Sequence, residues 1–240
     1  MSDTFRGDLL AGKRAVVIGA TSGIGAAIAR ALADVGAAVT ATGTTAFDVA
    51  QAQAAAEVLD VRDGGAVERF FGRFDTLDIL VNCAGIIRRG DEHDTAIFAD
   101  VVDVNLTGTM RCCAAARTRL AAARGCIVNT ASVLAFFGGG LVPAYAASKG
   151  GVAQLTKSLA IAYANEGIRV NAIAPGWVRT PLTRALQDTP ARDAAIVART
   201  PLARWADPDD IAGAALFLCA PAARFVTGIV LPVDGGYMIA

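Results

Sequence analysis

A tyrosine and a lysine four residues apart offer the first chemistry in this sequence. Tyr145 and Lys149 stand in an alanine-rich stretch that predicts a helix, and Pro143 fits its first turn, where a missing N–H costs nothing. Positions i and i+4 share one face of a helix, so the phenol and the ammonium should be neighbours. We expect the positive charge to lower the pKa of Tyr145 from about 10 toward neutrality, which would let the phenol exchange a proton with an alcohol oxygen. The same spacing also fits two unrelated surface residues, so the rest of the chain must decide.

The composition narrows the class of protein. The chain has 240 residues, of which 54% are hydrophobic, enough for a sizeable core. Its formal net charge is zero and no basic cluster occurs, so we expect no nucleic-acid partner. No apolar run is long enough to span a membrane, and the N-terminus lacks the pattern of a signal peptide. We therefore expect no membrane association and a cytoplasmic location.

The cysteines and the single histidine argue against two further kinds of site. His93 is the only histidine in the sequence. We therefore expect neither a histidine-based metal centre nor a Ser-His catalytic triad. The cysteines are odd in number and lie in apolar runs without C-x-x-C spacing, so we interpret them as reduced core residues and expect no metal site. They are Cys83, Cys112, Cys113, Cys126 and Cys219.

A glycine-rich turn near the N-terminus predicts a phosphate site. The apolar run 14–20 is typical of a buried parallel strand, and a helical stretch reaches about Val35. Glycines between them would let the backbone approach a pyrophosphate at the helix N-terminus, although a tight turn without a ligand has the same composition. The residues expected to contact a cofactor here are Gly19, Thr21, Ser22, Gly23, Ile24 and Gly25.

The next strand, 37–42, should end at the adenosine ribose. An acid at that point would bind the 2′-hydroxyl of NAD, and a base would accept the 2′-phosphate of NADP. The chain has Gly43, Thr44 and Thr45 there, so charge leaves the choice open. The short crossover over 44–55 predicts a helix of only one or two turns.

Two further strands are predicted at 57–60 and 77–83. Asp60 and Val61 should meet the adenine, although Asp60 could instead cap a helix over 63–74. Small residues after the second of these strands permit close approach of a ring or a sugar; the run is Asn82, Cys83, Ala84 and Gly85.

The second half continues the alternation of strands and helices. Strands are expected at 126–132, which ends on Ser132, at 168–175 and at 229–233. The stretch 95–123 predicts one long helix or two abutting ones, with Asn105 in the middle. The alternation predicts a Rossmann-like, doubly wound sheet of seven parallel strands with helices on both faces. We find no internal linker or repeat, so residues 1–240 form one domain.

Taken in order, these motifs resemble the short-chain dehydrogenases/reductases over essentially the whole chain. The matching residues are Gly19, Gly23, Ile24, Gly25, Asn82, Ala84, Gly85, Asn105, Ser132, Tyr145, Lys149, Pro175 and Gly176. Each motif alone is weak, but six in register are specific. Two departures are small: Ile18 stands where the family usually has Thr, and Cys83 where it usually has a second Asn.

The resemblance implies a role for each residue. Tyr145 would be the general acid/base, and Lys149 would lower its pKa and hold the nicotinamide ribose. Ser132 would orient the substrate oxygen, and Asn105 would bend its helix and hold a water that links Lys149 to solvent. The remaining cofactor contacts implied by the family are Asn82, Ala84, Gly85, Pro175, Gly176, Val178 and Thr180. A hydride would then pass between NAD or NADP and a secondary alcohol or ketone.

The substrate should be set by the segment 183–200, an expected lid of short helices, and by Arg88 and Arg89. Paired arginines could bind a carboxylate, or they could be solvated surface residues. Several stretches resemble the branch of the family that acts on sugar acids such as 2-deoxygluconate and 2-keto-3-deoxygluconate; they are 84–89, 132–136, 142–145 and 204–205. The resemblance to that branch favours NAD over NADP as the expected cofactor. Phe136, Phe137 and Trp205 could form an apolar wall of the pocket or belong to the core.

Two other functions stay open. A 3-oxoacyl-(acyl carrier protein) reductase would use a basic docking surface, which Arg88, Arg89, Arg179 and Arg184 could supply. A catalytically silent dinucleotide-binding regulator would not need the four catalytic positions that the chain retains. The resemblance also implies a homotetramer with a small-molecule substrate.

Overall fold

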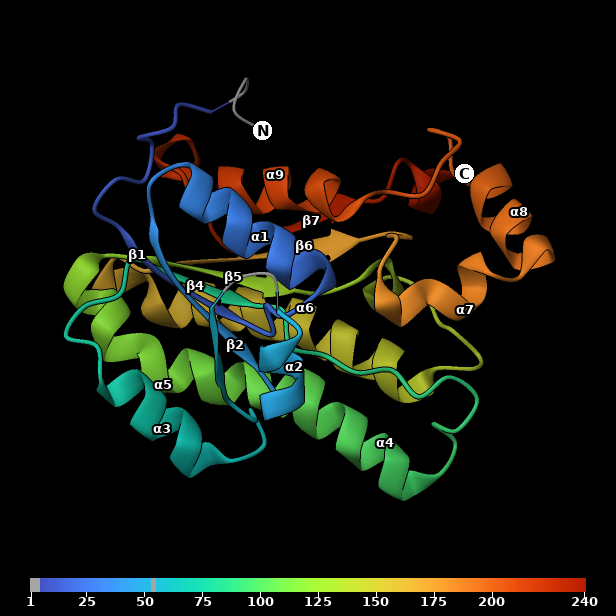
Figure 1. The fold of residues 1–240 in the computed structure, drawn as a ribbon, viewed down its shortest axis with the longest axis horizontal. Coiled ribbons are helices and arrows are strands. Elements are labelled where there is room, and N and C mark those ends of the chain that lie inside the picture. Colours follow the sequence, from blue (N-terminus) through green and yellow to red (C-terminus); the bar gives the residue numbers. More distant parts are fainter. Residues whose placement is uncertain (1–4, 53–54) are drawn as a thin grey trace.

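The computed structural model describes residues 5–52 and 55–240, and a parallel sheet runs through the middle of the molecule (Figure 1). Within these residues the sheet has seven strands in the order β3-β2-β1-β4-β5-β6-β7, which confirms the predicted doubly wound architecture. The strands are β1 (Arg14–Ile18), β2 (Ala38–Gly43), β3 (Ala56–Val58), β4 (Ile79–Asn82), β5 (Cys126–Thr130), β6 (Arg169–Pro175) and β7 (Val230–Val233).

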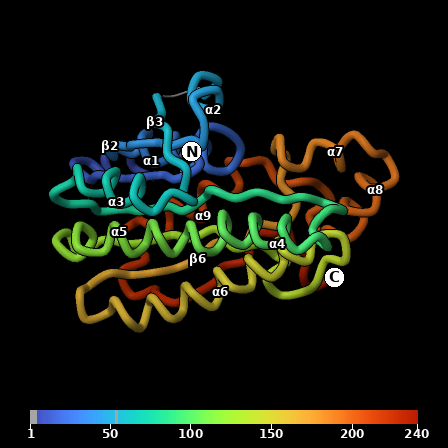
Figure 2. Tube along the Cα trace, turned by 90° about the horizontal axis from the view of Figure 1, so that it is seen from below, coloured from blue at the N-terminus to red at the C-terminus, as the bar shows by residue number. Residues whose placement is uncertain are grey.

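Helices cover both faces of the sheet (Figures 1 and 2). One face carries α1 (Gly23–Asp34) and α9 (Pro208–Cys219), which pack on each other. The sequence patterns do not predict the second of these helices. The other face carries α3 (Gly64–Gly72), α4 (Thr95–Val102), α5 (Gly108–Ala123) and α6 (Pro143–Tyr163). The other α-helices in the described residues are α2 (Ala46–Ala50), α7 (Arg184–Gln187) and α8 (Pro190–Arg199).

The core is divided by the sheet because neighbouring strand residues point to opposite faces. Val17 packs with Leu32 and Leu216 under α1 and α9, whereas Val16 packs with Phe71 and Leu120 on the opposite side. Strands buried on both faces need apolar residues at every position, which is why β1 reads as a continuous apolar run. All five cysteines are free thiols, and Cys83 is the only one of them that is not fully buried.

The predicted helical stretch 95–123 is interrupted once. A π-helical turn over Asp103–Thr107 separates α4 from α5 and carries Asn105 at its centre. Asp94 caps α4 by accepting hydrogen bonds from two N–H groups of its first turn. The distortion therefore lies inside a helix whose ends are well defined.

The strand order fixes where a ligand can bind. The chain leaves β1 toward β2 and β3 on one side, and it returns to β4 on the other side of β1. In an open parallel sheet this reversal leaves a crevice at the carboxyl ends of the strands. Gly19 follows β1, Gly43 ends β2 and Cys83 follows β4, so the predicted cofactor residues meet at this edge. No helix in the described part of the chain is both long and apolar enough to cross a membrane.

Candidate active site

A cleft of about 500 Å³ opens at this edge of the sheet. Its walls come from the segments after β1, β2 and β4, from α6, and from the segment before α7. This volume lies in the range of small-molecule sites. The predicted residues that line it are Gly19, Thr21, Ser22, Gly23, Ile24, Gly25, Gly43, Thr44, Asp60, Val61, Ala84, Gly85, Arg88, Tyr145, Lys149 and Thr180.

The turn after β1 has the shape that a pyrophosphate needs. Gly19 adopts a left-handed φ of 77°, and a Cβ there would lie 2.6 Å from the backbone of Ala84. A Cβ on Gly25 would lie 2.1 Å from the carbonyl oxygen of Gly19. The side chain of Ser22 makes no capping hydrogen bond to the described residues, so the first N–H groups of α1 can bind an anion. The diphosphate of a dinucleotide fits this cradle.

Tyr145 and Lys149 lie one turn apart on α6, which begins at Pro143 as predicted. Lys149 is 3% exposed, and its Nζ donates a hydrogen bond of 2.6 Å to the carbonyl oxygen of Thr130 at the end of β5. The same nitrogen lies 5.6 Å from the centre of the Tyr145 ring. Burial of the amine lowers the pKa of Lys149 to about 8.

The expected lowering of the tyrosine pKa is not found. Desolvation raises the pKa of Tyr145 above its usual value; a hydrogen bond from Ser132 opposes this rise, the charge on Glu92 adds to it, and the charge on Arg89 opposes it. Lys149 is not among the groups that shift the pKa of Tyr145, and its Nζ donates to a backbone carbonyl instead. The phenol therefore stays protonated at neutral pH, which is the form that can donate a proton.

Asn105 is fully buried and joins three parts of the site. Its Oδ1 accepts a hydrogen bond of 2.8 Å from the N–H of Ile86, and its Nδ2 donates to the carbonyl of Ile86 and to Ser148 Oγ, both at 3.0 Å. A Cβ on Gly85 would lie 3.3 Å from Asn105 Oδ1 and 3.6 Å from Lys149 Nζ, so both polar atoms face this glycine. The amide thus connects the π-helical turn to the loop after β4 and to α6.

Ser132 lies just beyond β5 and is 7% exposed. Its Oγ accepts a hydrogen bond of 3.2 Å from the N–H of Leu134, at the start of a 3-10 turn over Val133–Ala135. Because this bond uses only a lone pair, the hydroxyl proton remains available for the Tyr145 phenol or for a substrate oxygen.

Four residues that were predicted to border the cofactor lie outside the lining of the cleft: Asn82, Pro175, Gly176 and Val178. Asn82 is buried and donates to Asn129 Oδ1 at 2.9 Å and to Cys113 Sγ at 3.3 Å. It therefore links β4 to β5 and α5. The other three lie where the chain leaves β6, and their contact with a cofactor stays a prediction.

The adenosine end contains an acid that the sequence reading missed. Asp48 lines the cleft from α2, and its Oδ2 accepts hydrogen bonds from the N–H and the hydroxyl of Thr45 at 3.0 and 2.8 Å. Thr45 in turn caps the N–H of Asp48, which completes a capping box. The Thr-x-x-Asp spacing is the sequence signal that could have found it.

Asp60 lies in the cleft as predicted and does not cap the following helix. Its carboxylate binds the backbone and the guanidinium of Arg62, whereas Asp63 caps α3 through the N–H of Ala66 at 2.9 Å. The pair leaves Asp60 ionised, because the hydrogen bonds of Arg62 hold the pKa of that carboxyl below its usual value.

The loop after β4 brings Arg88 to the cleft, with Arg89 beside it, and both side chains are exposed. In the part of the chain that the structure describes, neither guanidinium forms an ion pair. Sequence reasoning also missed Glu92, which is 1% exposed and accepts hydrogen bonds from the N–H groups of Arg88 and Tyr145. No spacing in the sequence signals this contact.

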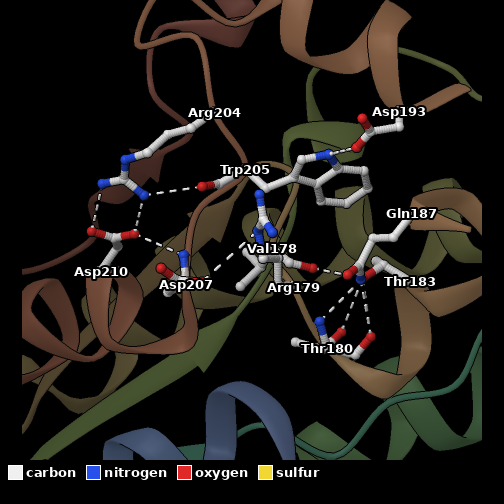
Figure 3. Close-up of polar contacts among 10 residues, drawn as sticks. All are labelled: Val178, Arg179, Thr180, Thr183, Gln187, Asp193, Arg204, Trp205, Asp207 and Asp210. Carbon is white, nitrogen blue, oxygen red and sulfur yellow. Dashed lines mark hydrogen bonds and ion pairs between the residues drawn. The ribbon is translucent and has the colours of Figure 1, made fainter. Parts of the chain in front are cut away.

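The segment 183–200 forms the predicted short helices, α7 and α8, and Figure 3 shows how it is fastened. Thr183 Oγ1 donates to the carbonyl of Val178 at 2.6 Å and accepts from Gln187 Nε2 at 2.9 Å. At the far end, the indole of Trp205 donates to Asp193 Oδ1 of α8 at 2.7 Å. The segment is thus tied to the body of the protein at both ends.

The three aromatic residues expected near the substrate lie in different surroundings. Trp205 is 1% exposed and belongs to the core, where it packs edge-on against Trp177. Phe136 is half exposed, and Phe137 packs near Tyr237 with Arg199 over its ring. None of the three lines the cleft among the described residues.

Known oxidoreductases are similar to this protein over nearly the whole chain. Residues 19–238 match the family model described as Enoyl-(Acyl carrier protein) reductase. A cis-4-hydroxycyclohexanecarboxylate dehydrogenase of Sinomonas cyclohexanicum is 44% identical, over 96% of this chain and 98% of the relative. A 2-dehydro-3-deoxy-D-gluconate 5-dehydrogenase of Bacillus subtilis is 42% identical, over 95% and 96%.

One similar solved structure contains a bound dinucleotide cofactor. The gluconate 5-dehydrogenase of Burkholderia cenocepacia, in complex with NADP and tartrate, superimposes with a TM-score of 0.89 at 36% identity and covers 98% of each chain. With the cleft, the glycine cradle and the Tyr145–Lys149 pair already in place, these matches leave one conclusion. The chain belongs to the short-chain dehydrogenase/reductase family and is an NAD(P)-dependent oxidoreductase that acts on CH–OH groups.

Proposed function

We propose that the substrate is a hydroxy or keto carboxylic acid of the sugar-acid type, such as 2-keto-3-deoxygluconate, with the carboxylate held by Arg88 and Arg89. The observation that carries this proposal is the position of the two arginines. Arg88 lines the same cleft as Tyr145, and the charge of Arg89 acts to lower the pKa of the Tyr145 phenol. Exposed guanidinium groups beside a proton donor suit a substrate whose carboxylate lies a few atoms from its carbonyl.

The names of the relatives support the same chemistry. The cyclohexane compound and the deoxygluconate compound share a carboxylate and a reacting carbon that is remote from it. Tartrate, present in the Burkholderia complex, is also a hydroxy carboxylate. The reductase named in the family model describes the family level, so an acyl-carrier substrate remains the alternative.

The residues of this chain would divide the work as follows. When bound, the nicotinamide supplies or accepts the hydride. Ser132 Oγ holds the substrate oxygen, and the Tyr145 hydroxyl gives that oxygen its proton during reduction or takes it during oxidation. Lys149 fixes the geometry beside Tyr145 through its bond to β5. Asn105 and Lys149, whose polar atoms both lie beside Gly85, would hold a water through which the proton passes between Lys149 and solvent.

A substrate matrix tests the proposal. NADH and NADPH are each assayed with 2-keto-3-deoxygluconate, 4-oxocyclohexanecarboxylate, cyclohexanone and an acetoacetyl thioester. We expect the two carboxylates to be reduced at least tenfold more efficiently than cyclohexanone, which lacks the charged group. Preferential turnover of the thioester would refute the carboxylate assignment and support the acyl-carrier alternative.

Removing the charges of the two arginines provides a second test of the carboxylate assignment. Replacing Arg88 and Arg89 with Ala should raise KM for the carboxylates by roughly 10- to 100-fold, because charge-assisted hydrogen bonds are lost. The matched variant Arg179→Ala/Arg184→Ala removes two other exposed guanidinium groups and should leave this KM unchanged. Equal losses in both double variants would instead indicate a broad docking surface for an acidic carrier.

We also propose a homotetramer in the cytoplasm. Exposed apolar side chains support assembly; they are Phe98 on α4, Ile161 on α6, and Phe225 and Ile239 near the C-terminus. Light scattering on the purified protein measures the mass. A monomeric mass at micromolar concentration would contradict the proposal.

A further inference from the structure

Glu92 is a buried acid that the reaction described above does not use. Its residue is 1% exposed, and its two carboxylate oxygens reach two different parts of the site. Oε1 accepts a hydrogen bond of 2.9 Å from the N–H of Arg88, and Oε2 accepts one of 2.8 Å from the N–H of Tyr145. One side chain therefore holds the backbone of the arginine loop and the backbone of the proton-donating residue together.

The position at the start of α6 explains why an acid is stable there. Pro143 occupies the first turn of this helix, and the N-cap residue Val142 makes no side-chain capping bond to the described residues. The first N–H groups of a helix lack internal partners and carry a partial positive charge, so they attract an anion. Glu92 supplies this anion from outside the helix, which offsets much of the cost of burying it.

Two neighbouring bonds show that the loop and the helix meet along a seam. The N–H of Gly90 donates to the carbonyl of Leu141 at 2.9 Å, and His93 Nε2 lies 3.0 Å from the carbonyl oxygen of Gly140. Both bonds hold the approach to α6, whereas only Glu92 reaches the residue that bears the reacting phenol. A neutral acceptor could satisfy one N–H group, but it would not satisfy both with equivalent oxygens.

We propose that Glu92 is a positioning residue of the reaction, which sets the spacing between the arginine loop and Tyr145 and so aligns the substrate's carbonyl with the phenol. The proposal rests on the proposed function, because it needs a substrate held by Arg88 and Arg89. It extends that function by assigning the alignment to one carboxylate that touches neither substrate nor cofactor. Small displacements of reacting groups have large effects on rate, so loss of this clamp should reduce turnover strongly.

The charge of Glu92 provides a readout that does not depend on turnover. The groups that face the Tyr145 phenol are Ser132, Lys149, Glu92 and Arg89. A carboxylate near a phenol penalises the phenolate and raises the pKa of the phenol. Removing that charge should therefore shift the Tyr145 titration to lower pH, whether or not a substrate turns over.

Three variants separate charge from geometry. Glu92→Gln keeps the size but removes the charge and one acceptor, and Glu92→Asp keeps the charge but is too short to reach both N–H groups. Glu68→Gln is the matched control, because Glu68 is an exposed acid on α3 remote from the cleft lining. We expect kcat to fall roughly 10- to 100-fold in both Glu92 variants and to be unchanged in the control.

The decisive measurement is the titration of ¹³Cζ-labelled tyrosine by NMR, with Tyr145→Phe used to assign the signal. The Tyr145 titration should move to lower pH in Glu92→Gln and stay near its original position in Glu92→Asp. A wild-type kcat and an unmoved titration in Glu92→Gln would reduce Glu92 to a helix cap and overturn the proposal. If Glu92→Gln does not fold, a full kcat in Glu92→Asp overturns it in the same way, and a reduced kcat supports it.

The experiment also distinguishes this proposal from the substrate assignment. If carboxylates are not preferred but some other ketone is reduced, kcat for that ketone and the NMR titration are read in the same variants. A shifted titration with reduced kcat then supports the clamp while the sugar-acid assignment fails.

Discussion

The two ends of the cleft are built in different ways. At the reaction end, Asn105, Ser132 and Lys149 are each at most 7% exposed, and each is held by hydrogen bonds to neighbouring elements. At the adenosine end, Asp60 and Arg62 are partly exposed and hold each other by an ion pair. Buried polar groups with fixed partners are rigid, whereas exposed charges are screened and adaptable.

This difference separates chemistry from selectivity. Changes at the reaction end should reduce the rate by orders of magnitude, because several buried contacts define one geometry. Changes at the adenosine end should alter the preference between cofactors by much smaller factors. Variants at each end, and in the segment 183–200, test this contrast.

The largest effect should follow from Tyr145→Phe. Removing the hydroxyl that exchanges the proton with the substrate oxygen should lower kcat roughly 10²- to 10⁴-fold, the range typical of general acid catalysis. Cofactor affinity, measured by the quenching of protein fluorescence, should change less than threefold. Tyr163→Phe is the matched control on the same helix, and it should keep full activity. Retained turnover in Tyr145→Phe would make the assignment of the proton donor wrong.

The second effect is the contribution of Lys149 to the pH dependence of stability. A lysine with a pKa of about 8 in the folded protein binds fewer protons than the same lysine in the unfolded chain, where its pKa is 10.5. Because the unfolded chain binds more protons between these values, stability should rise with pH in this window. Between pH 7.5 and 9.5 the gain attributable to Lys149 should be about 2 kcal/mol.

The measurement is chemical denaturation of the cofactor-free protein at both pH values and one protein concentration. Lys149→Met removes the titrating group, so the difference between wild type and variant isolates its contribution. The wild type should gain about 2 kcal/mol more than the variant over this range. Parallel pH dependences would mean that Lys149 is not desolvated in solution.

The same contrast explains what could be predicted from the sequence. The alternation of strands and helices, the glycine turn, and the positions of Tyr145 and Lys149 follow from periodicity and spacing, because each depends on residues that are close in the chain. The pKa shift of Tyr145 was predicted with the wrong sign. Its direction depends mainly on the burial of the phenol, which is not visible in a local pattern.

The missed residues show the same limit. Glu92 contacts Tyr145 across 53 positions of the chain, and only the folded protein brings the two together. Asp48 could have been predicted from the sequence, since its capping-box partner Thr45 lies three positions before it, but its place in the cleft depends on how α2 packs after β2. Asn82 was matched by its motif, yet its amide is turned into the core between β4 and β5.

The third prediction tests the adenosine end through Asp48. A carboxylate beside the ribose edge should repel the 2′-phosphate of NADP, so Asp48→Asn should raise the ratio of kcat/KM for NADPH over NADH by about tenfold at low salt. Asp63→Asn is the matched control, because Asp63 caps α3 in a similar way outside the cleft lining. An unchanged ratio in Asp48→Asn would show that this carboxylate does not contribute to the choice of cofactor.

The smallest effect should come from the segment 183–200, which follows the cleft residues Thr180, Pro181 and Leu182 and belongs to neither end. Asp193→Asn weakens the hydrogen bond that the buried indole of Trp205 donates to α8, and the charge on its acceptor is lost. Such a loss costs about 1 kcal/mol locally, so α8 should exchange its amide hydrogens faster and KM for the ketone should rise about fivefold. Because no reacting group moves, kcat should stay within a factor of two. Asp188→Asn, an exposed acid between α7 and α8, provides the control. If kcat fell as much as KM rose, the segment would belong to the rigid reaction end, and the contrast between the two ends would have to be redrawn around it.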